Sequence, residues 1–172
     1  MNAIVLVIPI ILLRYPFMAF INQAALSRAG FFPPTEGKER VAYYIYQITT
    51  IFLLFYLIFG KIHLNTTYDY IGLFLFIIGG LLYAKSVLDF SKPQKDGLNL
   101  KGLYQYSRNP MYVSFFLYFL GCSLLIGSLI YFVVLIIFQG SVHFLILSEE
   151  RWCRKNFGKA YEKYMGRVRR YF

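Results

Sequence analysis

The chain has 172 residues, of which 58% are hydrophobic and only 15% are charged. This balance excludes a soluble domain of this size, and the length excludes two domains, so we expect one integral membrane domain over residues 1–172. The net charge of +10 does not indicate nucleic acid, because the basic residues cluster between apolar segments, where they can bind anionic lipid headgroups.

Three apolar segments in the first half of the chain predict transmembrane helices, since about 20 apolar residues cross the hydrocarbon of a bilayer. They cover residues 3 to about 20, residues 41–59, and residues 70 to about 88. The third segment contains Gly72, Gly79 and Gly80, which offer small surfaces for close approach of another helix.

Arg14 lies near the middle of the first predicted helix. An intramembrane arginine is a functional hypothesis, in which it pairs with an anionic group of a substrate. The alternative, which we favour, is that its long side chain reaches the headgroups. The polar connection over residues 22–40 contains Pro33, Pro34 and Gly37, and it is either ordered over a site or only a linker.

Residues 111–148 contain no Asp, Glu, Lys or Arg. Their 38 residues exceed one crossing, so they predict a hairpin of two helices that reverses at Gly127-Ser128. We therefore expect an all-α, polytopic membrane protein with about five transmembrane helices. The hairpin brings Arg108, before its first helix, level with Glu149 and Glu150, after its second. A basic loop that faces an acidic pair in a partly dry site suits a ligand with both charge signs.

The chain beyond Glu149 predicts an amphipathic C-terminal helix on the membrane surface, because apolar residues recur at largely helical spacing between basic ones. These residues are Trp152, Phe157, Tyr161, Tyr164, Met165 and Val168. In a five-span chain, all of the 18 lysines and arginines except Lys61 fall on one side. The positive-inside rule then predicts an external N-terminus, with the motif, the glutamates and the C-terminus in the cytoplasm.

Several separately spaced motifs surround the predicted hairpin. They are Gly102-x-Tyr104-x-x-x-Arg108-Asn109-Pro110-x-Tyr112, Glu149-Glu150-Arg151, and Phe157-Gly158-x-x-Tyr161-x-x-Tyr164. Together they resemble the isoprenylcysteine carboxyl methyltransferase and phospholipid methyltransferase superfamily of integral membrane enzymes, over about residues 97–170. The resemblance implies S-adenosylmethionine as methyl donor. Asn109 stands where that family usually has His, and Asn keeps a donor and an acceptor but cannot titrate.

The resemblance also implies roles for individual residues. It assigns Arg108 to a carboxylate of the cofactor or substrate, and Glu149 and Glu150 to the hydroxyls or ammonium of the donor. The other assignments are cofactor hydrogen bonds for Asn109 and Tyr112, and the shape of the loop for Tyr104 and Pro110.

The expected catalytic residues are Arg108, Glu150 and His143, and no metal ion is expected. His143 is the titratable group within the hairpin, and it can act as a base or orient Glu150. The alternative is a histidine that is hydrogen-bonded in the core.

The scarcity of bases near the motif favours some acceptors over others. A carboxylate or a readily ionised thiol needs no base, whereas a protonated amine must first lose its proton. We expect methyl transfer to a lipophilic acceptor that enters from the bilayer, first an isoprenylcysteine-type carboxylate. The alternatives are a phospholipid amine, a small thiol, a non-catalytic membrane subunit that retains the fold, and a nicotinamide-dependent reductase. Membrane lipids are the other expected partners.

Overall fold

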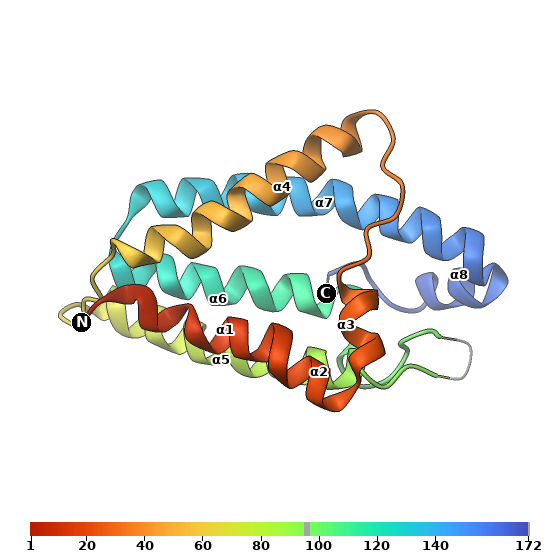
Figure 1. Ribbon diagram of the computed structural model, residues 1–172, viewed down its shortest axis with the longest axis horizontal. Helices are drawn as coiled ribbons and strands as arrows, with labels where there is room; N and C mark the ends of the chain where they lie inside the picture. The colour runs from red at the N-terminus through yellow and green to blue at the C-terminus, as the bar shows by residue number, and fades with distance from the viewer. Residues whose placement is uncertain (95–96, 172) are drawn as a thin grey trace.

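The computed structural model describes residues 1–94 and 97–171, and its helices run along one long axis (Figure 1). Four segments are long and apolar enough to cross a membrane, namely Ala3–Ile21, Lys38–Ile58, Thr67–Phe90 and Leu129–Phe157. A shorter apolar helix, α6 (Pro110–Ile126), has 17 residues, which at about 1.5 Å per residue extend it close to the thickness of the hydrocarbon core. The predicted all-α fold with about five membrane helices is confirmed.

The first membrane segment is not one regular helix. It consists of η1 (Ala3–Leu6), α1 (Ile8–Leu12), η2 (Leu13–Phe17) and α2 (Met18–Ile21). The turn η2 is π-helical and contains Pro16, which has no N–H to donate to the preceding turn. Arg14 lies in the same π-helical turn, a local geometry that is frequent at functional sites.

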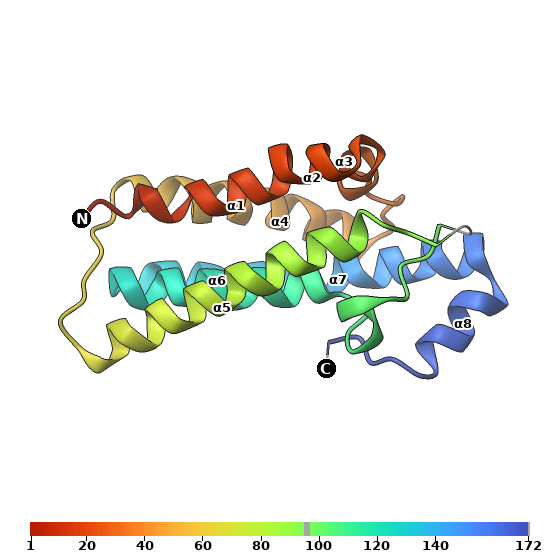
Figure 2. The same ribbon diagram turned by 90° about the horizontal axis from the view of Figure 1, so that it is seen from below.

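Residues 22–40 form more than the linker that the sequence left open. The side chain of Asn22 accepts the amide of Ala24 at 3.0 Å and caps α3 (Gln23–Ala29), a helix that the sequence did not predict. The Asn22 side-chain amide also donates to the Ser91 carbonyl at 2.9 Å. These bonds hold α3 against the end of α5 (Thr67–Phe90), as Figure 2 shows.

The predicted hairpin is confirmed. Helix α6 ends at Gly127, whose φ of 60° is the left-handed conformation that glycine adopts without steric cost. The hydroxyl of Ser128 then accepts the Tyr131 amide at 3.2 Å and caps α7 (Leu129–Phe157). Because α6 and α7 run antiparallel (Figure 1), the first residues of α6 lie at the same end of the bundle as the last turns of α7.

Helices α5 and α6 touch backbone to backbone. A Cβ atom added to Gly79 would lie 2.5 Å from the Tyr118 amide nitrogen, and one added to Gly121 would lie 2.6 Å from the Gly72 carbonyl oxygen. Small residues permit this approach. The prediction was therefore right for Gly72 and Gly79, but it missed Gly121. It was wrong for Gly80, whose added Cβ would meet the Tyr118 ring at an ordinary 3.6 Å.

Buried tyrosines tie the other helices together. Helix α4 (Lys38–Phe55), which continues into η3 (Tyr56–Ile58), packs along α7. The Tyr131 hydroxyl donates to the Leu53 carbonyl at 3.0 Å, and the Tyr118 hydroxyl donates to the Leu6 carbonyl. A buried hydroxyl requires such a partner, so each bond specifies how two helices sit on one another.

The predicted C-terminal amphipathic helix is divided in the structure. Helix α7 continues through Glu149 to Phe157, Gly158 takes a φ of 51°, and α8 (Lys159–Met165) turns back. The positive φ, which favours glycine, ends α7. Tyr161 and Tyr164 then pack against Leu98 in a small separate core, beside η4 (Gly102–Gln105). The apolar stripe therefore faces protein.

The contact between α5 and α6 gives a prediction for Gly121→Ala. Its new methyl group would meet the Gly72 carbonyl oxygen, so the free energy of unfolding should fall by roughly 1–3 kcal/mol. An unfolding titration in mixed micelles measures this change. Gly140→Ala in α7 is the matched control, because nothing lies within 4 Å of its added Cβ, and it should change stability by less than about 1 kcal/mol, in the stabilising direction. Equal stability of the two variants would contradict the packing.

Candidate ligand pocket

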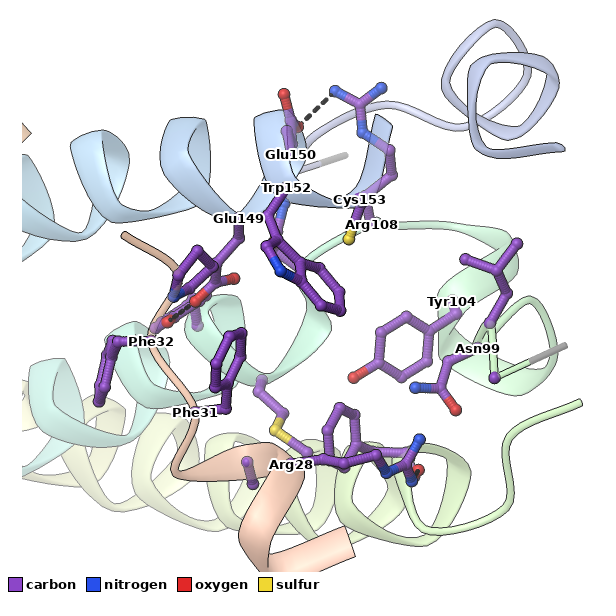
Figure 3. A pocket seen from close by; sticks show the side chains of 18 of the residues that line it. Arg28, Phe31, Phe32, Asn99, Tyr104, Arg108, Glu149, Glu150, Trp152 and Cys153 are labelled. Carbon is purple, nitrogen blue, oxygen red and sulfur yellow. Dashed lines mark hydrogen bonds and ion pairs between the residues drawn. The ribbon is translucent and has the colours of Figure 1, made fainter. Parts of the chain in front are cut away.

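A cavity of about 550 Å³ lies where α6 begins and α7 ends, and Figure 3 shows it from close by. Its volume is within the range of about 300–1,000 Å³ that is usual for small-molecule sites. The wall comes from residues 27–33, 97–115 and 149–164, together with Arg14, Tyr46 and Phe90. The hairpin thus brings the two predicted clusters to one cavity, as expected.

Glu150 joins three parts of the chain through two arginines. Arg108 Nη2 donates to its Oε1 at 2.8 Å, and Arg170 donates from Nε to Oε1 at 3.0 Å and from Nη2 to Oε2 at 2.8 Å. The side chains of Arg108 and Glu150 are only 8% and 3% exposed. Both carboxylate oxygens of Glu150 are therefore already engaged, and its first role in the structure is to hold the two arginines in place.

The C-terminal segment is fastened to the predicted motif. The Arg108 amide donates to the Arg169 carbonyl at 3.0 Å, and the Asn109 side-chain amide donates to the Arg170 carbonyl at 3.0 Å. Asn109 also lines the pocket. Asn109, at the position where the family usually has His, thus uses a side-chain N–H to bind the C-terminal segment.

Glu149 faces the cavity with one oxygen accepting the Tyr112 hydroxyl at 2.7 Å. No lysine or arginine of residues 1–94 and 97–171 forms an ion pair with it. Glu149 and Tyr112 lie among aromatic side chains of the wall. Figure 3 shows Phe31, Phe32 and Trp152 beside Glu149. A carboxylate that forms no ion pair in such a wall favours a cationic ligand.

Tyr104 supplies a protonated hydroxyl to the cavity. Its carbonyl accepts the Tyr164 hydroxyl at 2.6 Å, which fixes its backbone, and its ring lines the pocket. Burial raises the pKa of Tyr104 well above its usual value, so the hydroxyl stays a hydrogen-bond donor at neutral pH.

Two other predicted residues lie outside the pocket wall. Pro110 is the first residue of α6, where its missing N–H costs nothing. His143 Nδ1 lies 2.8 Å from the Tyr171 hydroxyl and is not among the residues that line the cavity. The structure therefore places His143 in the alternative role, as a hydrogen-bonded histidine that fastens the C-terminal segment.

Two buried polar atoms of the wall have no hydrogen-bond partner among the described residues. They are Oδ1 of Asn99, an acceptor, and Nε of Arg108, a donor. Such atoms are costly unless something satisfies them, and both belong to residues that line the cavity. No pattern in the sequence indicated Asn99, which lies in a turn-rich loop without a motif.

Arg14 corrects an expectation. It lines the pocket, and its Nη2 donates to the Ala29 carbonyl at 2.6 Å, so it faces inward rather than reaching the headgroups as we favoured. Arg28, which the sequence did not single out, also lines the pocket. Its Nη2 donates to the Phe90 carbonyl at 2.8 Å, and its guanidinium lies 4.8 Å from the centre of the Phe90 ring.

Residues 30–37, which we call the strap, connect α3 to α4 beside the cavity (Figure 1). The Phe31 ring lies 5.4 Å from the Trp152 ring between centroids. Just beyond the strap, Arg151 forms a bidentate ion pair with Glu39, with N–O distances of 2.6 and 2.7 Å. Arg151 also donates to the carbonyl of Pro34, in the strap, at 3.2 Å. The strap is thus ordered over the site.

Five apolar helices with a ligand-sized pocket at one end define a multi-pass membrane protein with a candidate active site. The chain belongs to the phospholipid methyltransferase family, which matches residues 68–160, more than half of its length. The match confirms the predicted superfamily and supports a membrane methyltransferase. No curated protein and no solved structure matches the chain. The matched residues include Arg108, Glu149 and Glu150, whereas Arg14, Arg28 and the strap precede them.

The shared carboxylate gives a stability prediction. Glu150→Gln should lower the free energy of unfolding by roughly 3–5 kcal/mol, because it leaves Arg108 buried without a counter-charge. The unfolding titration in mixed micelles measures the loss. Glu162→Gln is the control, since Glu162 is exposed on α8 and forms none of the ion pairs of the described residues. A loss no larger than that of the control would show that the arginines do not depend on Glu150.

The strap gives a second prediction. Glu39→Gln removes the ion pair with Arg151. Trypsin should then cleave the chain between Arg28 and Arg40 about two- to five-fold faster, because a partly exposed ion pair contributes roughly 0.5–1 kcal/mol. Glu36→Gln makes the same charge change on the strap itself but leaves that ion pair intact, and trypsin should cleave this variant at the wild-type rate. Equal rates for the two variants would mean that the pair does not hold the strap.

Proposed function

We propose that this protein transfers a methyl group from S-adenosylmethionine to a lipophilic acceptor, first a carboxylate of the isoprenylcysteine type. The observation that carries the proposal is Glu149, a carboxylate with no ion-pair partner among the described residues, facing an aromatic cavity. Membership of a methyltransferase family supplies the chemistry.

The pocket fits this donor in charge and in hydrogen bonding. S-adenosylmethionine carries cationic centres, a carboxylate and hydroxyls, and Glu149 would attract the cations. Arg108 and Asn99, which line the cavity, would offer a donor and an acceptor to the remaining polar groups. Aromatic residues of the wall, including Tyr104 and Trp152, give its flat adenine a stacking surface.

When bound, the donor supplies a methyl group on a positively charged sulfur. The chain's own residues would align the reactants and exclude water from them, which lowers the barrier for a reaction in which opposite charges meet. Phe31 and Trp152, in contact across the cavity, would keep water out. Arg108, which Glu150 holds in place, would orient the donor.

An ionised carboxylate fits the absence of a base. Among the described residues that line the cavity there is no histidine or lysine, and His143 is engaged with Tyr171. A carboxylate is deprotonated at neutral pH and needs no base, whereas an ammonium must lose a proton. The name of the matched family favours a second candidate acceptor, a phospholipid amine, for which Glu149 would have to take the proton.

We also propose that the pocket faces the cytoplasm and the N-terminus the exterior. The N-terminus lies at the end of the bundle away from the pocket (Figure 1), and the basic residues of the connections and the C-terminal segment gather at the pocket end. The positive-inside rule assigns that end to the cytoplasm.

The proposal predicts that the purified protein binds S-adenosylmethionine and that Glu149→Gln weakens binding about 10- to 100-fold, the loss expected for one charge-assisted contact. Isothermal titration calorimetry measures the affinity. Glu36→Gln should bind like the wild type. A well-folded wild-type sample that gives no heat with the donor would overturn the proposal and favour a non-catalytic subunit. Transfer of labelled methyl to a panel of carboxylate, phospholipid amine and thiol acceptors then identifies the acceptor.

A further inference from the structure

Arg14 and Arg28 place two guanidinium groups in the pocket wall from a part of the chain outside the family match. They reach it from different helices, Arg14 from the π-helical turn of the first membrane segment and Arg28 from the end of α3. Arg14 donates to the carbonyl of Ala29, the neighbour of Arg28. The two side chains thus belong to one region of the wall.

Neither guanidinium has a carboxylate partner among the described residues. Each donates a hydrogen bond to a backbone carbonyl, and a guanidinium has five N–H donors. Carbonyl groups satisfy hydrogen bonds but do not neutralise charge. Two cations without counter-charges in the wall of one partly dry cavity raise the cost of burial.

The other charges of the wall do not remove this excess. The carboxylate of Glu150 is shared by Arg108 and Arg170, which leaves Glu149 as the remaining anion that lines the cavity. Even if Glu149 is counted against one of the two arginines, a positive charge remains. A cationic methyl donor would increase the excess further, so charge balance requires an anion.

We propose that Arg14 and Arg28 form a binding subsite for an anionic headgroup, a carboxylate or a phosphodiester, on a lipid-like acceptor. The role of this subsite in positioning an acceptor rests on the proposed methyl transfer, whereas the binding of an anion by the two arginines does not. Guanidinium groups bind both of these anions through paired N–H donors. The cation–π contact with Phe90 and the carbonyl bonds hold the two side chains in place before the anion arrives.

The single tryptophan of the chain gives a direct binding signal, because Trp152 lines the same cavity. The full chain in lipid nanodiscs is titrated with N-acetyl-S-dodecylcysteine, with its neutral primary amide, and with a dodecyl methyl phosphodiester, and Trp152 fluorescence is recorded. We expect the wild type to bind at least one of the two anions about tenfold or more tightly than the amide. The better anion identifies the headgroup. Equal affinity for all three probes would overturn the subsite, whatever the variants do.

Matched variants locate the effect. Arg14→Gln and Arg28→Gln should each weaken binding of the preferred anion about tenfold, with binding of the amide unchanged. Arg28→Lys should recover part of the loss. Arg40→Gln, at an exposed position that does not line the cavity, should bind all probes like the wild type. An anion preference that survives in both glutamine variants would overturn the assignment to these residues.

Donor binding separates this inference from the proposed function. Calorimetry with S-adenosylmethionine is run on the same samples, and the glutamine variants should keep its affinity within about threefold, since these arginines are assigned to the acceptor. Anion preference without donor binding would support the subsite and refute the methyltransferase. Donor binding without anion preference would do the reverse.

Discussion

The buried carboxylate of Glu150 is the interaction on which the pocket depends. It brings together the end of α7, the loop before α6 and the C-terminal segment, through Arg108 and Arg170. A buried ion pair is weak evidence for stability, because desolvation offsets much of the attraction. The effect of the ion pairs here is on position, since they hold three segments around one cavity. The hairpin makes this possible, because it returns α7 to the end where α6 began.

The two adjacent glutamates consequently have different surroundings. Successive residues of a helix project about 100° apart, so Glu150 points to the arginines while Glu149 points into the cavity beside Tyr112. The sequence analysis assigns both glutamates to the methyl donor and adds a catalytic role for Glu150. The structure separates a carboxylate that holds protein from one that is open to a ligand, which is the distinction that the proposed function uses.

The sequence predicted those features that depend on one segment at a time or on a single reversal. Apolar length gave the membrane helices, Gly127-Ser128 gave the hairpin, and the family motifs gave Arg108, Tyr104 and Glu149 in the cavity wall. Gly121 was missed because a close approach of helices depends on which residue lies opposite, and no pattern within one helix records that. The break at Gly158 was missed because the apolar spacing continues across it, whereas the backbone angle does not.

The orientation of Arg14 also could not be predicted from the sequence. A long basic side chain in an apolar helix is compatible both with the headgroups and with the interior, and the choice depends on whether a cavity lies within its reach. The fold supplies one, through α3 and the strap, neither of which has a strong sequence signature. The residues that face the cavity from residues 14–33 could therefore be identified only in three dimensions.

The cavity has two walls of separate origin. Residues 97–164 carry the family motifs, and residues 14–33 precede the matched region. The earlier wall meets the later one where the Phe31 ring contacts the Trp152 ring. Under the proposed roles, methyl transfer belongs to the later stretch and binding of the acceptor to the earlier one, so that exchanging the amino-terminal portion would change specificity and keep the reaction centre.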